Sequence, residues 1–142
     1  MLPASGASGA SIPGSRKGAE ANEWVQRLAI KTPTPRLPVS SLSGGNQQRV
    51  VLAKWMAGKP RVLVLNRPTV GVDVGSKAGI HEIIMELASA GVGVIVVSDE
   101  LPELMRICDR ILVIRSGRLV AERRVEESSE EEIMGIVSES AA

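Results

Sequence analysis

A short apolar run, a helical segment and a second apolar run follow one another in the middle of the chain. The two runs cover residues 62–65 and 92–97. Between them, over about residues 76–90, apolar side chains recur at helical spacing, at Ile80, Ile83, Ile84, Leu87 and Ala88. Two parallel strands need such a crossover, which is right-handed almost without exception. The sequence therefore predicts an α/β fold with a mostly parallel sheet flanked by helices, its first strand covered on both faces.

The whole chain is expected to divide into three segments. Residues 1–17 are rich in Ala, Ser, Gly and Pro, which predicts a disordered tail. Residues 18–58 are expected to be helical, with one helix over about 18–28 and another from Gly44 or Gly45 to about 57, which buries Val51, Leu52, Trp55 and Met56. Residues 59–142 are expected to form the α/β core and to close with a hairpin and a helix.

Composition limits the class of partner. The 142 residues carry a net charge of +1, and 44% of them are hydrophobic. That balance argues against nucleic acid or a membrane surface as the main partner. No apolar run approaches the roughly twenty residues of a membrane span. A single cysteine, Cys108, and no secretion signal make the cytoplasm the expected compartment.

The segment SLSGGNQQRVVLA, residues 41–53, places a hydroxyl and two glycines just before a predicted helix. Unpaired backbone N–H groups and the positive end of the helix dipole would then face one point, where Ser43 can donate to a phosphate oxygen. Gly44 and Gly45 lack the Cβ atoms that would keep a bulky anion away. An ordinary serine cap with turn glycines fits the same residues.

The order of the following motifs resembles a known family. LSGGNQQR leads through a helix to the run VLVL and then to NRPTVGVDVGSK. Over about residues 24–137 this resembles the ABC transporter ATPases, most closely the second nucleotide-binding half of the tandem ATPases that energise bacterial sugar importers. The resemblance implies a partial P-loop NTPase fold in which four residues contact ATP held by another domain, namely Ser43, Gly44, Gly45 and Asn46.

The same resemblance implies the partners. Asp73 matches the aspartate of the D-loop, the turn that crosses the interface between two nucleotide-binding domains, and it can also cap the helix starting near Ser76. The partners implied are another ABC nucleotide-binding domain and transmembrane permease subunits, with no nucleic acid. ATP and Mg²⁺ would be bound only in that assembly, on the inner face of the plasma membrane.

Three residues depart from the family pattern where this chain would act on its own nucleotide. Asn66 replaces the Walker B aspartate that holds Mg²⁺, and Arg67 replaces the glutamate that polarises the attacking water. Asp99 stands at the position of the switch histidine. We therefore expect no intact catalytic residue, no metal site and no hydrolysis by this chain alone. Arg67 and Asp99 could form a half-buried ion pair or remain two solvated charges.

A phosphate loop of the form Gly-x-x-x-x-Gly-Lys-Ser/Thr does not occur in the sequence. A fold lacking the strand that leads into this loop would leave an open sheet edge beside residues 92–97, which favours pairing with another chain, including a second copy.

His81 is predicted to be a solvated residue on the polar side of its helix, near Lys77 and Glu82. A rival interpretation of the whole chain is a non-catalytic fragment that acts only through protein contacts.

Overall fold

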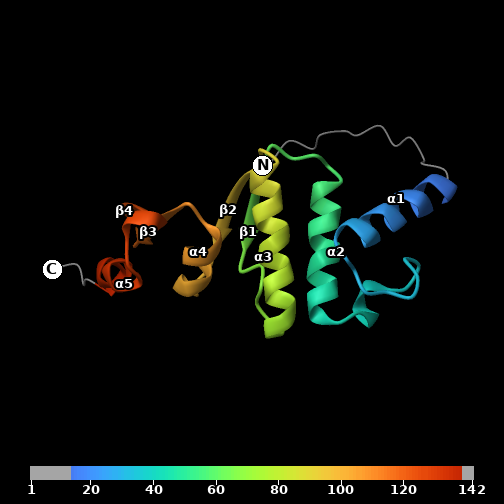
Figure 1. The fold of residues 1–142 in the computed structure, drawn as a ribbon, viewed down its shortest axis with the longest axis horizontal. Coiled ribbons are helices and arrows are strands. Elements are labelled where there is room, and N and C mark those ends of the chain that lie inside the picture. The colour runs from blue at the N-terminus through green and yellow to red at the C-terminus, as the bar shows by residue number, and fades with distance from the viewer. Residues whose placement is uncertain (1–13, 139–142) are drawn as a thin grey trace.

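The computed structural model describes residues 14–138 (Figure 1). The helices and strands follow in the order α1 (Gly14–Arg27), α2 (Gly44–Met56), β1 (Val62–Asn66), α3 (Val74–Ser89), β2 (Gly93–Val97), α4 (Leu101–Ile107), β3 (Arg110–Arg115), β4 (Arg118–Arg124) and α5 (Glu130–Ser138). Two short 3₁₀ helices cover Val39–Ser41 and Val125–Glu127.

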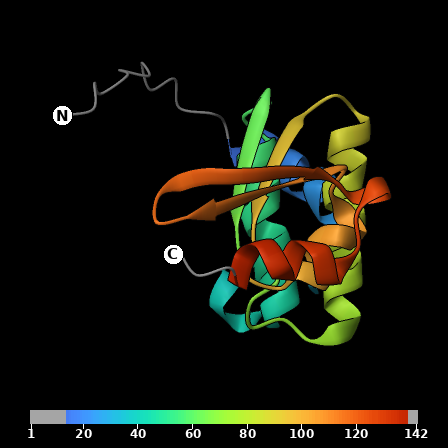
Figure 2. The ribbon, with the colours of Figure 1, turned by 90° about the vertical axis from the view of Figure 1, so that its left-hand side faces the viewer.

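The central β-α-β unit is confirmed. Strands β1 and β2 pair in parallel, from Val62 opposite Gly93 to Asn66 opposite Val97, and α3 connects them. Strands β3 and β4 form a separate antiparallel hairpin that runs across the direction of β1 and β2 (Figure 2). The expectation of a mostly parallel sheet is therefore wrong for the described residues, because half of their strands are antiparallel.

The main core lies on one face of β1 and β2. Leu63 and Leu65 of β1 pack with apolar residues of α2 and α3, and these two helices lie side by side in Figure 1. The alternate residues of both strands point the other way and are half exposed or more, namely Val62, Val64, Ile95 and Val97. The prediction of a sheet covered on both faces is thus wrong here, since the described helices cover only one face.

A second, smaller core joins the carboxy-terminal elements. Ile133 of α5 is 1% exposed and packs with Leu101, Ile111 and Val113. The first turn of α5 is fixed by a capping box, in which the Ser129 hydroxyl accepts from the Glu132 N–H and the Glu132 carboxylate accepts from the Ser129 N–H. The hairpin, α4 and α5 therefore form one unit beside the β-α-β unit.

Two details of the amino-terminal half differ from expectation. Helix α1 begins at Gly14, inside the segment predicted to be a tail, and residues 1–13 of that segment lie outside the described residues. Trp55 is 58% exposed and Val51 45%, although both were expected to be buried. Helix α2 buries only the side that faces the core, through Leu52, Ala53 and Met56. Trp55 instead lines a hollow of about 460 Å³ beside β1.

Over residues 14–138, no helix combines the length and the apolar character needed to cross a membrane. The same residues contain no group of three or more His, Cys, Asp or Glu side chains placed to hold a metal ion.

Candidate functional site

The start of α2 presents a serine hydroxyl that does not cap the helix. Ser43 occupies the cap position, but its Oγ accepts a hydrogen bond of 2.8 Å from Asn46 Nδ2 and none from the helix backbone. Asn46 Oδ1 in turn accepts from the Lys31 N–H at 2.8 Å, which fixes the amide. Ser43 is exposed, so its own hydrogen can still be donated outward.

The backbone at this helix start also carries donors. The first hydrogen bond of α2 runs from the Gln47 N–H to the Ser43 carbonyl at 2.9 Å. The N–H groups of Gly44, Gly45 and Asn46 precede it and point out of the helix end, where the dipole is positive. A hydroxyl and three N–H donors at one helix end are suited to an oxygen-rich anion.

The two glycines have a packing role that the sequence did not reveal. A Cβ on Gly45 would lie 2.5 Å from both Cβ and Oγ of Ser76 at the start of α3. A Cβ on Gly44 would lie 3.0 Å from the carbonyl oxygen of Gly71. Both directions lead to the turn after β1 and the first turn of α3. The glycine pair therefore allows α2 to approach that region closely.

The turn between β1 and α3 is held from two sides. Gln48 of α2 donates from Nε2 to the Pro68 carbonyl at 2.9 Å. At the other end, Asp73 Oδ1 accepts from the Ser76 N–H at 3.0 Å, so the cap role predicted for Asp73 is confirmed. Hydrogen bonds from the Ser76 hydroxyl and N–H lower the pKa of the Asp73 carboxyl. The start of α2, which carries Ser43, Gly44, Gly45 and Asn46, and the Asp73 turn thus belong to one packed region.

The carboxyl ends of β1 and β2 bring Arg67 and Asp99 together. The Arg67 N–H donates to the Val97 carbonyl at 2.7 Å, and its guanidinium lies 3.2 Å from Asp99 Oδ2. The side chains are 56% and 69% exposed, so the pair forms but is solvated rather than half-buried. Asn66 is also exposed at this edge. Arg67 adopts a left-handed φ of 47°, which is unfavourable for a residue with a Cβ.

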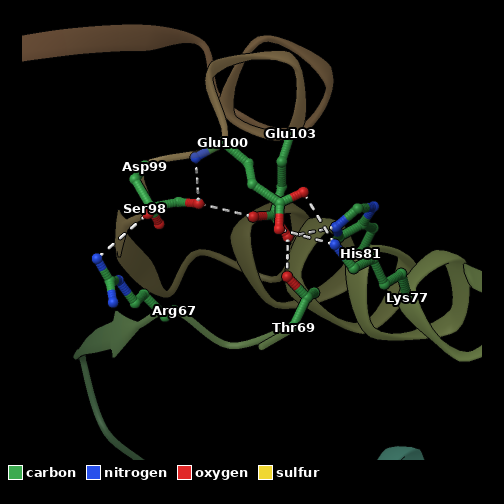
Figure 3. Close-up of polar contacts among 8 residues, drawn as sticks. All are labelled: Arg67, Thr69, Lys77, His81, Ser98, Asp99, Glu100 and Glu103. Carbon is green, nitrogen blue, oxygen red and sulfur yellow. Dashed lines mark hydrogen bonds and ion pairs between the residues drawn. The ribbon is translucent and has the colours of Figure 1, made fainter. Parts of the chain in front are cut away.

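His81 is buried, which corrects the prediction of a solvated surface residue. It is 7% exposed, and its Nε2 lies 2.8 Å from Oε1 of Glu103 on α4 (Figure 3). Helix α4 covers the side of α3 that the sequence pattern assigned to solvent. The prediction failed because the polarity of His81 alone does not reveal that it has a buried polar partner. Within the described residues, His81 Nδ1 has no hydrogen-bond partner.

Glu103 is the centre of this buried network. Its Oε1 also accepts from the Thr69 hydroxyl at 2.5 Å, and its Oε2 accepts from the Ser98 hydroxyl at 2.8 Å. Burial acts to raise the pKa of Glu103, but the hydrogen bonds from Thr69, His81 and Ser98 outweigh it and lower the pKa. No motif in the sequence marked Glu103, since its partners are 5 to 34 residues away along the chain.

A family model described as ABC transporter matches residues 5–70. The ribose import ATP-binding protein RbsA 2 of Rhizobium etli is 48% identical over 127 residues, covering 89% of this chain and 25% of that protein. The xylose import ATP-binding protein XylG of Geobacillus kaustophilus is 50% identical over 115 residues, covering 81% and 23%. The chain thus spans about a quarter of the length of these curated relatives.

Solved structures share the fold. The dimeric structure of the bacterial ABC transporter cassette MJ0796 matches with a TM-score of 0.69 at 24% identity, over 81% of this chain and 50% of that one. A nucleotide-free ATP-binding cassette from an ABC transporter matches with a TM-score of 0.72, over 92% of this chain and 50% of that one. At this identity the likeness concerns the fold alone.

Proposed function

Because the chain belongs to the family of ABC transporter ATP-binding proteins, we propose that it is an ATP-binding component of a bacterial carbohydrate importer. In this proposal Ser43, Gly44, Gly45 and Asn46 form the signature that contacts ATP held on a partner domain. Asp73 lies in the turn that crosses to the same partner. The names of the relatives, which are ribose and xylose import proteins, support a sugar as the transported class.

The observation that carries the proposal is the state of the Ser43 hydroxyl. A serine whose only task is to start a helix would accept from a backbone N–H two or three residues on. Here the hydroxyl is oriented by Asn46 instead, at 2.8 Å, beside three N–H groups of the helix end. This arrangement favours a phosphate contact over the rival interpretation of a simple cap.

The chain's own hydrolytic site is proposed to be inactive. Its candidate residues do not fit Mg²⁺, because the one carboxylate among them, Asp99, is already paired with the Arg67 guanidinium. That guanidinium remains protonated and cannot accept a proton from water. ATP and Mg²⁺ would therefore be bound only in an assembly with a domain that carries a phosphate loop.

Association with such a domain tests the proposal. The full chain is mixed with an ABC ATPase domain that carries its own phosphate loop, with and without Mg·ATP, and complex formation is measured by light scattering. We expect ATP-dependent association that Ser43→Arg abolishes. Ser89→Arg makes the same charge change at the far end of α3, about 20 Å along the helix from Ser76, and should associate normally. Association that does not depend on ATP would instead support the protein-interaction fragment.

The remaining partners follow from the same proposal. Transmembrane permease subunits would hold the assembled component on the inner face of the plasma membrane. We also propose that the isolated chain pairs with a second copy through the outer edge of β2. Within the described residues β1 and β2 pair only with each other, and Ile95 and Val97 expose an apolar face beside that edge. A mass that rises with concentration, and does not rise for Ile95→Lys, would support this pairing; a constant monomer mass would refute it.

A further inference from the structure

The buried Glu103 carboxylate joins two segments that are far apart in sequence. Thr69 lies in the turn after β1, four residues before Asp73, and Ser98 follows directly after β2. Both hydroxyls donate to Glu103, which is only 7% exposed (Figure 3). His81 donates to the same carboxylate from the side of α3. One side chain of α4 therefore contacts the turn, the end of β2 and the crossover helix.

We propose that Glu103 is a positioning residue that holds the Asp73 turn and the segment 98–100 in one fixed arrangement. Two ion pairs also reach the segment 98–100. The Arg67–Asp99 pair is solvated on both sides, and the Lys77–Glu100 pair, at 2.8 Å, comes from α3 and is partly exposed. An exposed ion pair contributes little to fixing two loops, whereas buried hydrogen bonds to a carboxylate are strong. The buried network, and not these exposed pairs, therefore sets the position of the turn.

The geometry of the acceptor matters more than its charge. Oε1 accepts from Thr69 and His81, whereas Oε2 meets only the Ser98 hydroxyl. A glutamine can place its carbonyl oxygen at the Oε1 position and donate from its amide nitrogen to Ser98, because a hydroxyl can accept as well as donate. Glu103→Gln should therefore preserve the arrangement. Glu103→Ala leaves the donors of Thr69, His81 and Ser98 without their acceptor.

Amide hydrogen exchange of the full chain, followed by NMR, measures this directly. Two amides report on the turn, since the Val70 N–H donates to Arg67 and the Val72 N–H to Thr69. The Glu100 N–H, which donates to the Ser98 hydroxyl, reports on the other segment. In Glu103→Ala we expect exchange at all three amides to become about 10-fold to 100-fold faster, as loss of a strong buried hydrogen bond implies.

Single variants separate the two arms of the network. Thr69→Val should accelerate exchange at Val70 and Val72 only, although the backbone acceptors of both amides remain in place. Ser98→Ala should accelerate exchange at Glu100 only, in part because it removes the acceptor of that amide. Glu103→Gln should keep the amides of both segments as protected from exchange as in the unmodified chain. It should also keep the ring ¹⁵N signature of a hydrogen on His81 Nε2. Glu86→Ala removes an exposed carboxylate from α3 and serves as the control, with unchanged exchange.

The inference fails if folded Glu103→Ala shows unchanged exchange in both segments, or uniformly faster exchange throughout the chain. It also fails if Glu103→Gln behaves like Glu103→Ala. Should Glu103→Ala not fold, Thr69→Val decides, because this variant keeps the backbone acceptors of the Val70 and Val72 amides, and a network without a positioning role predicts unchanged exchange at both. A functional arm rests on the proposed function: Glu103→Ala should weaken ATP-dependent association. Absent association of the unmodified chain would refute that function and leave the exchange result standing.

Discussion

Substitution of Gly45 by alanine tests the close approach of α2 to α3. The new Cβ would lie 2.5 Å from Ser76 Cβ and Oγ, and 3.4 Å from Val72 Cγ1. The first distance is about 1 Å or more below the optimal carbon–carbon separation of about 3.5–4.0 Å. Because Ser76 Cβ is fixed to the backbone of α3, the conflict cannot be removed by rotating a side chain. One helix must move.

The magnitude follows from two opposing terms. Overpacking of this kind costs about 1–3 kcal/mol, while replacing a helical glycine by alanine gains up to about 1 kcal/mol. We expect Gly45→Ala to lower the free energy of unfolding by about 1–2 kcal/mol, measured by urea denaturation. Gly135→Ala is the matched control, because a Cβ at that position of α5 meets nothing within 4 Å. It should be neutral or stabilising.

A second-site change identifies the cause. Ser76→Gly removes the Cβ that Gly45→Ala meets, so the double variant should recover most of the lost stability relative to Ser76→Gly alone. Ser76→Ala retains that Cβ and should give no recovery. A Gly45→Ala protein as stable as the unmodified chain, or equal rescue by both Ser76 variants, would refute the packing argument.

Three further outcomes are expected. A double-mutant cycle on Arg67→Ala and Asp99→Ala should give a coupling below about 1 kcal/mol, since the pair is exposed, and a larger value would contradict its solvated geometry. Arg67→Gly should raise the free energy of unfolding by about 1 kcal/mol relative to Arg67→Ala, because φ is 47°. The lowered pKa of Glu103 means that its carboxylate stabilises the fold above the unfolded pKa of about 4.3. The stability difference between the unmodified chain and Glu103→Gln should therefore shrink as pH falls below about 4.

The parts of the fold that the sequence predicted are those set by local periodicity. The β-α-β unit follows from apolar runs at strand and helix spacing, and the hairpin follows from the turn at Ser116 and Gly117. Arg67 and Asp99 could be placed together because parallel strands end at one edge. Each of these inferences needs only neighbouring residues and the handedness of the crossover.

The parts that the sequence did not predict depend on contacts between distant elements. His81 has the polarity of a surface residue, and only the position of α4 makes it buried. Trp55 has the apolarity of a core residue, but it lines the hollow beside β1. Within the described residues β1 pairs only with β2, so no further strand covers that hollow. Neither polarity nor periodicity indicates where a partner element lies. His81 was therefore predicted to be exposed and Trp55 to be buried, and both predictions were wrong.

The Gly45 variants also separate two explanations of the glycine pair. If the glycines were needed to let a phosphate approach the backbone, Gly45→Ala with Ser76→Gly would recover stability but not ATP-dependent association. The structure favours the other outcome, because the Cβ direction of Gly45 leads into α3 and that of Gly44 leads to Gly71, while the donors lie at the open helix end. We therefore expect the double variant to recover both properties. Recovery of stability alone would show that the backbone of Gly45 itself must remain bare for the anion.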